Sequence, residues 1–187
     1  MPRLFVAVRT APDVADRLCQ AQAELAPLLS DVRWTKRESL HLTLKFMSHV
    51  DDGKVDEIQK ALQAAFSPLP RFTISCRGLG VFPDIRRPKV IWAGLEGGAL
   101  AALAETAEAA LAPLGFPREA RGFKPHLTIG RWREGARGGD RLRAELERWR
   151  HRDFGASAVD DAVLFQSVLK RTGAEYTPLK IFPLRKD

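Results

Sequence analysis

The chain has 187 residues but only two cysteines, Cys19 and Cys76, too few for a disulfide scaffold or a thiolate zinc site. It also has no apolar run near the roughly 18 residues that a membrane-spanning helix requires. The N-terminus lacks the separate apolar segment and small-residue cleavage site of a secretory signal. We therefore expect a cytoplasmic protein without a membrane anchor.

A glycine-rich phosphate loop is absent as well. Gly78 and Gly80 lack the further glycine and the lysine of a nucleotide-triphosphate loop. Acidic residues are fewer than basic ones, which gives a net charge of +7 and a pI near 9.8. A basic balance favours anionic partners such as phosphate esters or nucleic acid. Because the charges are spread along the chain, an arginine-rich soluble surface is an equal explanation.

What the chain does contain is one short motif that occurs twice. Residues 41–44 read His-Leu-Thr-Leu and residues 126–129 read His-Leu-Thr-Ile, although the whole chain has only four histidines. Both copies alternate polar and apolar residues, as a half-buried β-strand does. Residues two apart on a strand point to the same face, so each copy presents an imidazole beside a hydroxyl.

The spacing of apolar residues predicts alternating strands and helices. We expect helices from residue 12 and at 55–66, 100–114 and 142–149, and a loop at 134–140. We expect strands at 4–8, 32–35, 40–46, 72–82, 89–95, near 126, and at 159–169 and 176–184. This pattern indicates an α+β fold.

A shift of 85 residues aligns the two His-x-Thr motifs and also aligns residues 4–7 with residues 89–92. Each part then reads strand, helix, His-x-Thr strand. We expect one domain, residues 1–187, made of two pseudo-symmetric halves at about 1–85 and 86–187. The predicted architecture is two antiparallel sheets with helices outside and a cleft between them.

Two histidines facing each other across a cleft can act as a general base and a general acid, because imidazole titrates near neutral pH. Such a pair suits in-line displacement at phosphorus, with His41 and His126 as catalytic residues. Thr43 and Thr128 could bind the non-bridging phosphate oxygens. No carboxylate or cysteine recurs beside both motifs to complete a zinc site, so we expect neither metal nor cofactor.

Other contacts with a substrate stay open. Arg131 lies five residues after His126, an odd offset that turns it to the opposite face of a regular strand, although a bend at Gly130 could return it. Phe46, Phe82 and Tyr176 could stack on a base, or could simply pack in the core.

The doubled motif, with supporting stretches at residues 3–8, 40–46, 123–131, 167–169 and 176–179, resembles the 2H phosphoesterases. Within them, the chain is similar to the RNA 2′,3′-cyclic phosphodiesterases, also called 2′-5′ RNA ligases. The resemblance implies the pseudo-duplicated, two-lobed 2H fold. It also implies hydrolysis of RNA 2′,3′-cyclic phosphate ends to 2′-phosphomonoesters, and a related 2′-5′ joining of RNA ends.

Carried over residue by residue, the resemblance makes His41 the proton donor to the leaving 3′ oxygen and His126 the base that activates water. Thr43 and Thr128 become the phosphate-binding pair. The residues themselves permit either assignment of acid and base. Two alternatives stay open: a 2H activity on 2′-5′-linked oligonucleotides or small cyclic phosphates, and an RNA-binding module without turnover. The expected partner is RNA, and the expected state is a monomer.

Overall fold

The computed structural model describes residues 2–133, 139–170 and 173–186, so the predicted loop at 134–140 falls largely outside it. The helices are α1 (Pro12–Leu25), α2 (Val55–Phe66), α3 (Leu100–Leu111) and α4 (Asp140–Trp149). The strands are β1 (Arg3–Arg9), β2 (Val32–Trp34), β3 (His41–Met47), β4 (Phe72–Phe82), β5 (Val90–Glu96), β6 (His126–Trp132), β7 (Asp153–Val159), β8 (Asp161–Lys170) and β9 (Gly173–Pro183). Short 3-10 turns occupy Arg37–Ser39, Asp52–Lys54 and Ala112–Leu114.

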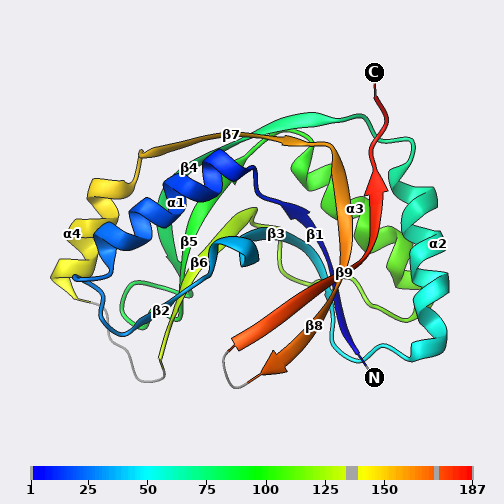
Figure 1. The fold of residues 1–187 in the computed structure, drawn as a ribbon, viewed down its shortest axis with the longest axis horizontal. Coiled ribbons are helices and arrows are strands. Elements are labelled where there is room, and N and C mark those ends of the chain that lie inside the picture. The colour runs from blue at the N-terminus through cyan, green and yellow to red at the C-terminus, as the bar shows by residue number, and fades with distance from the viewer. Residues whose placement is uncertain (1, 134–138, 171–172, 187) are drawn as a thin grey trace.

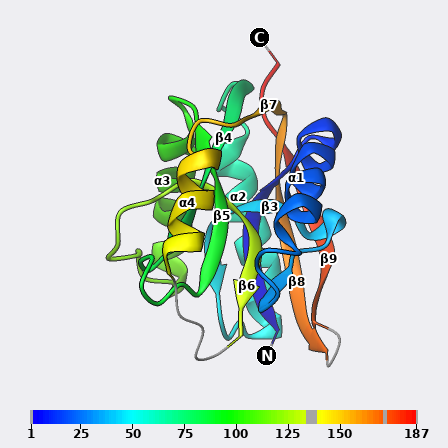
Figure 2. The same cartoon turned by 90° about the vertical axis from the view of Figure 1, so that its left-hand side faces the viewer.

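The strands form two antiparallel sheets. Sheet A has the order β3-β1-β8-β9, and sheet B has the order β2-β6-β5-β4-β7. In Figure 2, β8 and β9 lie on one side and β4 and β5 on the other, with β3 and β6 between them. The two adjoining strands, β3 and β6, are the His-x-Thr strands, and they contact each other. The predicted α+β fold with two antiparallel sheets is confirmed.

The helices divide between the two sheets. Helices α2 and α3 pack together against sheet A, whereas α1 and α4 contact β7 and β4 of sheet B (Figure 1). The apolar stripe of α2 explains its position: Ile58, Leu62 and Phe66 recur every four residues and are all fully buried. No helix in the described ranges is long and apolar enough to cross a membrane.

One strand was missed by the sequence prediction. The strand expected at 159–169 is β8, whereas β7, which ends at Val159 and is separated from β8 by Asp160, was not predicted. Strand β7 reads Asp-Phe-Gly-Ala-Ser-Ala-Val, with four consecutive small residues at its centre where strands usually have β-branched and aromatic side chains. It forms because β4 offers it an antiparallel edge from Phe72 to Arg77. Pairing with a distant strand therefore outweighs a weak local preference.

The pairing registers of the two His-x-Thr strands are equivalent. Adding 85 to each number in the β1–β3 pairs Arg9–His41 and Ala7–Thr43 gives the β5–β6 pairs Gly94–His126 and Trp92–Thr128. The register breaks at equivalent places too, between Val6 and Ala7 and between Ile91 and Trp92. This equivalence supports the predicted internal repeat.

The two sheets are nevertheless not the two sequence halves. Sheet A joins β1 and β3 with β8 and β9, and sheet B joins β2 and β4 with β5, β6 and β7. Each sheet thus takes strands from both sides of residue 85. A buried ion pair links the two halves as well, because Lys45 of β3 contacts Glu108 of α3 at 2.7 Å.

Candidate active site

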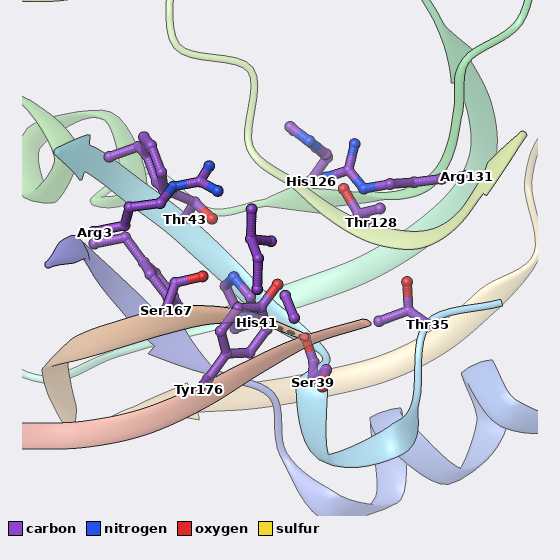
Figure 3. A pocket seen from close by; sticks show the side chains of 14 residues that line it. Arg3, Thr35, Ser39, His41, Thr43, His126, Thr128, Arg131, Ser167 and Tyr176 are labelled. Atoms are coloured by element: carbon purple, nitrogen blue, oxygen red, sulfur yellow. Dashed lines mark hydrogen bonds between the residues drawn. The ribbon is translucent and has the colours of Figure 1, made fainter. Parts of the chain in front are cut away.

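A cavity of about 420 Å³ lies where the two His-x-Thr strands adjoin. All four predicted site residues line it, His41 and Thr43 from β3 and His126 and Thr128 from β6 (Figure 3). The other lining residues come from both sheets and their connections: Arg3, Phe5, Thr35, Ser39, Phe46, Arg131, Ser167, Leu169, Ala174 and Tyr176. Alternation along each strand places each imidazole beside its hydroxyl, and the contact between β3 and β6 brings the two pairs into one cavity.

The two imidazoles are oriented by equivalent hydrogen bonds to the backbone. Nδ1 of His41 lies 2.8 Å from the carbonyl oxygen of Ser39, and Nδ1 of His126 lies 2.7 Å from that of Lys124. A carbonyl oxygen only accepts, so Nδ1 of each ring carries the proton and donates it. The bond assigns the tautomer, which leaves Nε2 as the nitrogen able to take up or release a proton.

Aromatic side chains hold each imidazole in place. The His41 ring lies 4.8 Å from Phe5 and 5.2 Å from Tyr176, and the His126 ring lies 5.1 Å from Phe82. These distances between ring centres are typical of packed aromatic pairs. Tyr176 lines the cavity, whereas Phe82 serves as packing beneath His126.

Burial in this apolar environment lowers the pKa of both histidines. The pKa of His41 falls to about 4, chiefly because burial disfavours the imidazolium, and the charges of Arg131 and His126 lower it further. Burial is also the main cause that lowers the pKa of His126, again assisted by Arg131. In the free protein both rings are therefore neutral at pH 7. A bound phosphate anion acts in the opposite direction.

A β-bulge in each His-x-Thr strand decides which further side chains enter the cavity. Leu44 in β3 and Ile129 in β6 are the extra residues at the two register breaks. An extra residue reverses the alternation beyond it, so Phe46 and Arg131 share a face with the threonines despite their odd offsets. This bulge provides the bend near Gly130 that could return Arg131 to the face of His126. The two equivalent positions thus carry an aromatic ring on one side and a guanidinium on the other.

Close packing fixes the bulge in β6. A Cβ atom added to Gly130 would lie 2.6 Å from Val32, so no larger residue fits there. From α1, the buried side chain of Gln22 donates Nε2 hydrogen bonds of 2.8 Å to the carbonyl oxygens of Ile129 and Thr35. Helix α1 thereby fixes both β2 and the bulge that turns Arg131 inward.

Several cavity residues were missed by sequence reasoning. Arg3 lies on β1, which pairs with β3, and Thr35 directly follows β2, which pairs with β6; only that pairing brings them to the site. The Arg3 guanidinium lies 5.1 Å from the centre of the Phe46 ring. Lys124, by contrast, contributes its carbonyl oxygen to His126, and its ammonium lies over Phe82.

The described residues offer no ready metal site. Among them, no three His, Cys, Asp or Glu side chains cluster as a metal ion would require. The cavity lining itself contains two imidazoles and no carboxylate or thiol. The chemistry available at this site is therefore that of two imidazoles, their neighbouring hydroxyls and the guanidinium groups.

The family model for LigT-like phosphoesterases matches two segments of the chain, residues 8–92 and 96–176. The chain belongs to this family. Its two His-x-Thr strands lie one in each matched segment of the LigT-like phosphoesterase model.

Curated relatives of this LigT-like phosphoesterase span nearly its full length. An RNA 2′,3′-cyclic phosphodiesterase of Methanothermobacter thermautotrophicus is 32% identical, over 97% of this chain and 98% of that protein. Another, of Archaeoglobus fulgidus, is 35% identical over 96% and 99%. The crystal structure of TT0787 of Thermus thermophilus has a TM-score of 0.84 at 27% identity and covers 99% of both chains. E. coli LigT complexed with 3′-AMP has a TM-score of 0.79 at 25% identity and covers 98% of both chains.

Proposed function

We propose that this LigT-like phosphoesterase hydrolyses RNA 2′,3′-cyclic phosphate ends to 2′-phosphomonoesters by direct acid/base catalysis. The observation that carries the proposal is the cavity lined by both His-x-Thr pairs, in which His41 and His126 each keep Nε2 available. The relatives that match nearly the whole chain are RNA 2′,3′-cyclic phosphodiesterases, which gives the substrate class.

In the proposed reaction, His126 acts as the base and His41 as the acid. Nε2 of His41 takes up its proton from solvent when the bound phosphate anion raises the pKa of that ring. Nε2 of His126 takes a proton from a water molecule, whose oxygen attacks phosphorus and forms the new P–O bond. The bond from phosphorus to the 3′ oxygen breaks, and that oxygen takes the proton from Nε2 of His41. The product keeps its phosphate on the 2′ oxygen. Solvent then returns the two histidines to their starting protonation states.

The hydroxyls and one arginine complete the proposed site. Thr43 and Thr128 line the cavity beside the histidines and donate hydrogen bonds to the non-bridging phosphate oxygens as negative charge develops. Arg131 extends toward His126 and Thr128 in Figure 3 and would balance the charge of the phosphate. Its positive charge also favours the anion that brings the histidines back toward their usual pKa.

The test is conversion of 2′,3′-cyclic AMP in the presence of excess chelator, with the product identified by phosphorus NMR. We expect adenosine 2′-phosphate as the product. His41→Asn and His126→Asn should each lower kcat/KM by about 100-fold or more, because a positioned acid or base contributes roughly that factor. Asparagine can still donate to the carbonyl oxygen that Nδ1 reaches, so the backbone contact is kept.

The exposed His49 supplies the matched control, since it lies outside the cavity lining. His49→Asn should hydrolyse the substrate at the rate of the unsubstituted protein. A 3′-phosphate product would contradict the proposed regiochemistry. Salt-sensitive RNA binding without any turnover would instead support a binding module. The monomeric state and the cytoplasmic location stay predictions.

A further inference from the structure

Two arginines lie side by side on the cavity face of sheet B. Arg33 of β2 is directly opposite Arg131 of β6 in the antiparallel register. Residues opposite each other on paired strands share a face, with Cβ atoms about 4.5–5.5 Å apart. Arg131 lines the cavity, so Arg33 stands next to it on the outermost strand of the sheet. Thr35, two residues after Arg33 and on the same face, lines the cavity as well.

Packing and hydrogen bonds hold the backbone around this pair of arginines in place. Val32 and Trp34 pack against Gly130 on the opposite face of β2, which leaves Arg33 on the cavity face. Gln22 holds the carbonyl oxygen of Thr35, as described above. Arg33 is therefore presented from a fixed strand.

This arrangement leaves a local excess of positive charge. Within the described residues, neither Arg33 nor Arg131 forms an ion pair or a side-chain hydrogen bond. Arg133, two residues after Arg131, donates its backbone N–H to the carbonyl oxygen of Asp31. Like charges opposite each other on a sheet are destabilising, and an anion between them removes that penalty.

We propose that Arg33 forms a second phosphate subsite, which binds the 5′ phosphate of the nucleotide that carries the cyclic phosphate. This inference rests on the proposed function. In an RNA chain that 5′ phosphate is the last phosphodiester before the cyclic end, whereas 2′,3′-cyclic AMP has a free 5′ hydroxyl in its place. The subsite would make the enzyme prefer RNA chain ends to mononucleosides.

The two sides of the cavity fix the direction of the bound chain. Arg131 extends toward His126 and Thr128 in Figure 3 and is thus committed to the cyclic phosphate, which leaves Arg33 for the next one. On the opposite side, the half-exposed ring of Phe46 lies under the Arg3 guanidinium, a surface suited to a base. The 5′ phosphate therefore leaves the cavity over β2, where Arg33 stands.

The test compares two substrates that differ by one group, 2′,3′-cyclic AMP and the same compound with a 5′ phosphate. The unsubstituted protein should prefer the 5′-phosphorylated substrate about tenfold in kcat/KM. Arg33→Gln should reduce that preference to less than twofold, and Arg33→Lys should retain part of it, because lysine keeps the charge but loses the bidentate contact. Arg143→Gln, an equal loss of charge on the exposed face of α4, should leave the preference intact.

Salt dependence provides a second readout that a structural role for Arg33 would not change. KM should rise more steeply with salt for the 5′-phosphorylated substrate, because salt screens its extra contact with a guanidinium, and Arg33→Gln should remove the difference. A preference that survives Arg33→Gln, or that Arg143→Gln abolishes equally, would overturn the subsite while leaving the proposed function intact. If neither substrate is hydrolysed, the proposed function is wrong and the subsite with it.

Discussion

The two candidate catalytic histidines make the same type of hydrogen bond but differ in their electrostatic environment. Each Nδ1 donates to the carbonyl oxygen two residues earlier, so the two Nε2 atoms are equivalent as proton carriers. The charges of Arg131 and His126 both lower the pKa of His41, whereas the charge of Arg131 lowers that of His126. Nearly equivalent geometry can therefore support unequal proton affinity.

These lowered pKa values predict the pH dependence of the reaction. The reactive form carries one proton on the pair, and in the free enzyme both pKa values lie below the usual 6.5 of histidine. Raising the pH above about 6.5 removes the proton that the acid must donate, so kcat/KM should fall roughly tenfold per pH unit. The optimum of kcat should lie at higher pH, because bound phosphate raises both pKa values. Initial rates across the pH range check this.

Arg131→Gln provides the control for this prediction. The substitution removes a positive charge that lowers the pKa of both histidines, so the alkaline fall of kcat/KM should move to higher pH. This shift is separate from any loss of affinity for phosphate. A kcat/KM that rises between about pH 6.5 and 8 would contradict the lowered pKa values.

The sequence predicts single residues well where local alternation controls them. His41, Thr43, His126 and Thr128 were predicted to lie together because each pair is two residues apart on one strand, and all four line the cavity. Arg131 stayed open because its direction depends on a bulge, which is a property of two paired strands. Residues brought in by a neighbouring strand, such as Arg33, leave no signal in the local pattern.

Among the helices and strands, those with a strong local periodicity were predicted, whereas the strand that depends on pairing with a distant strand was missed. The helix α2 and the strand β4 lie at the predicted residues because strong 3.6- and 2-residue periodicities mark them. Strand β7 has small residues, and pairing with β4 determines its conformation. Bulges belong to this second class as well, since one strand alone cannot specify them.

Helix α1 positions the bulge of β6 through one side chain, which gives a test at this scale. Gln22→Leu removes both Nε2 hydrogen bonds and leaves the Ile129 and Thr35 carbonyl oxygens without that donor. We expect the free energy of unfolding to fall by about 1–3 kcal/mol, because buried polar groups lose partners. We also expect kcat/KM to fall, since Arg131 and Thr35 are no longer fixed. Denaturant titration and initial rates measure the two effects.

Gln20, which is exposed on the same helix, supplies the matched variant. Gln20→Leu changes the same atoms without touching the bulge, so both stability and kcat/KM should stay close to those of the unsubstituted protein. Equal behaviour of the two leucine variants would mean that α1 does not determine the position of the bulge.

For the whole molecule, the two predicted sequence halves and the two sheets do not coincide. The registers of β1–β3 and β5–β6 are equivalent under a shift of 85, yet each sheet contains strands from both halves of the chain. The candidate active site depends on this exchange, because β3 of sheet A and β6 of sheet B must meet to form the cavity. The 85-residue shift predicts a repeat, but it could not predict which strands pair.

This exchange predicts that residues 1–85 do not fold alone. In that fragment β2 loses β6, its single partner in the sheet, and β4 loses both β5 and β7. Helix α1 loses its contact with β7, including the bond from Arg17 to the Phe154 carbonyl oxygen. We expect the fragment to lack a cooperative thermal transition by circular dichroism, whereas co-expression with 86–187 should restore both the transition and hydrolysis of 2′,3′-cyclic AMP. Cooperative unfolding of 1–85 alone would make each half an independent unit, contrary to the interleaved sheets.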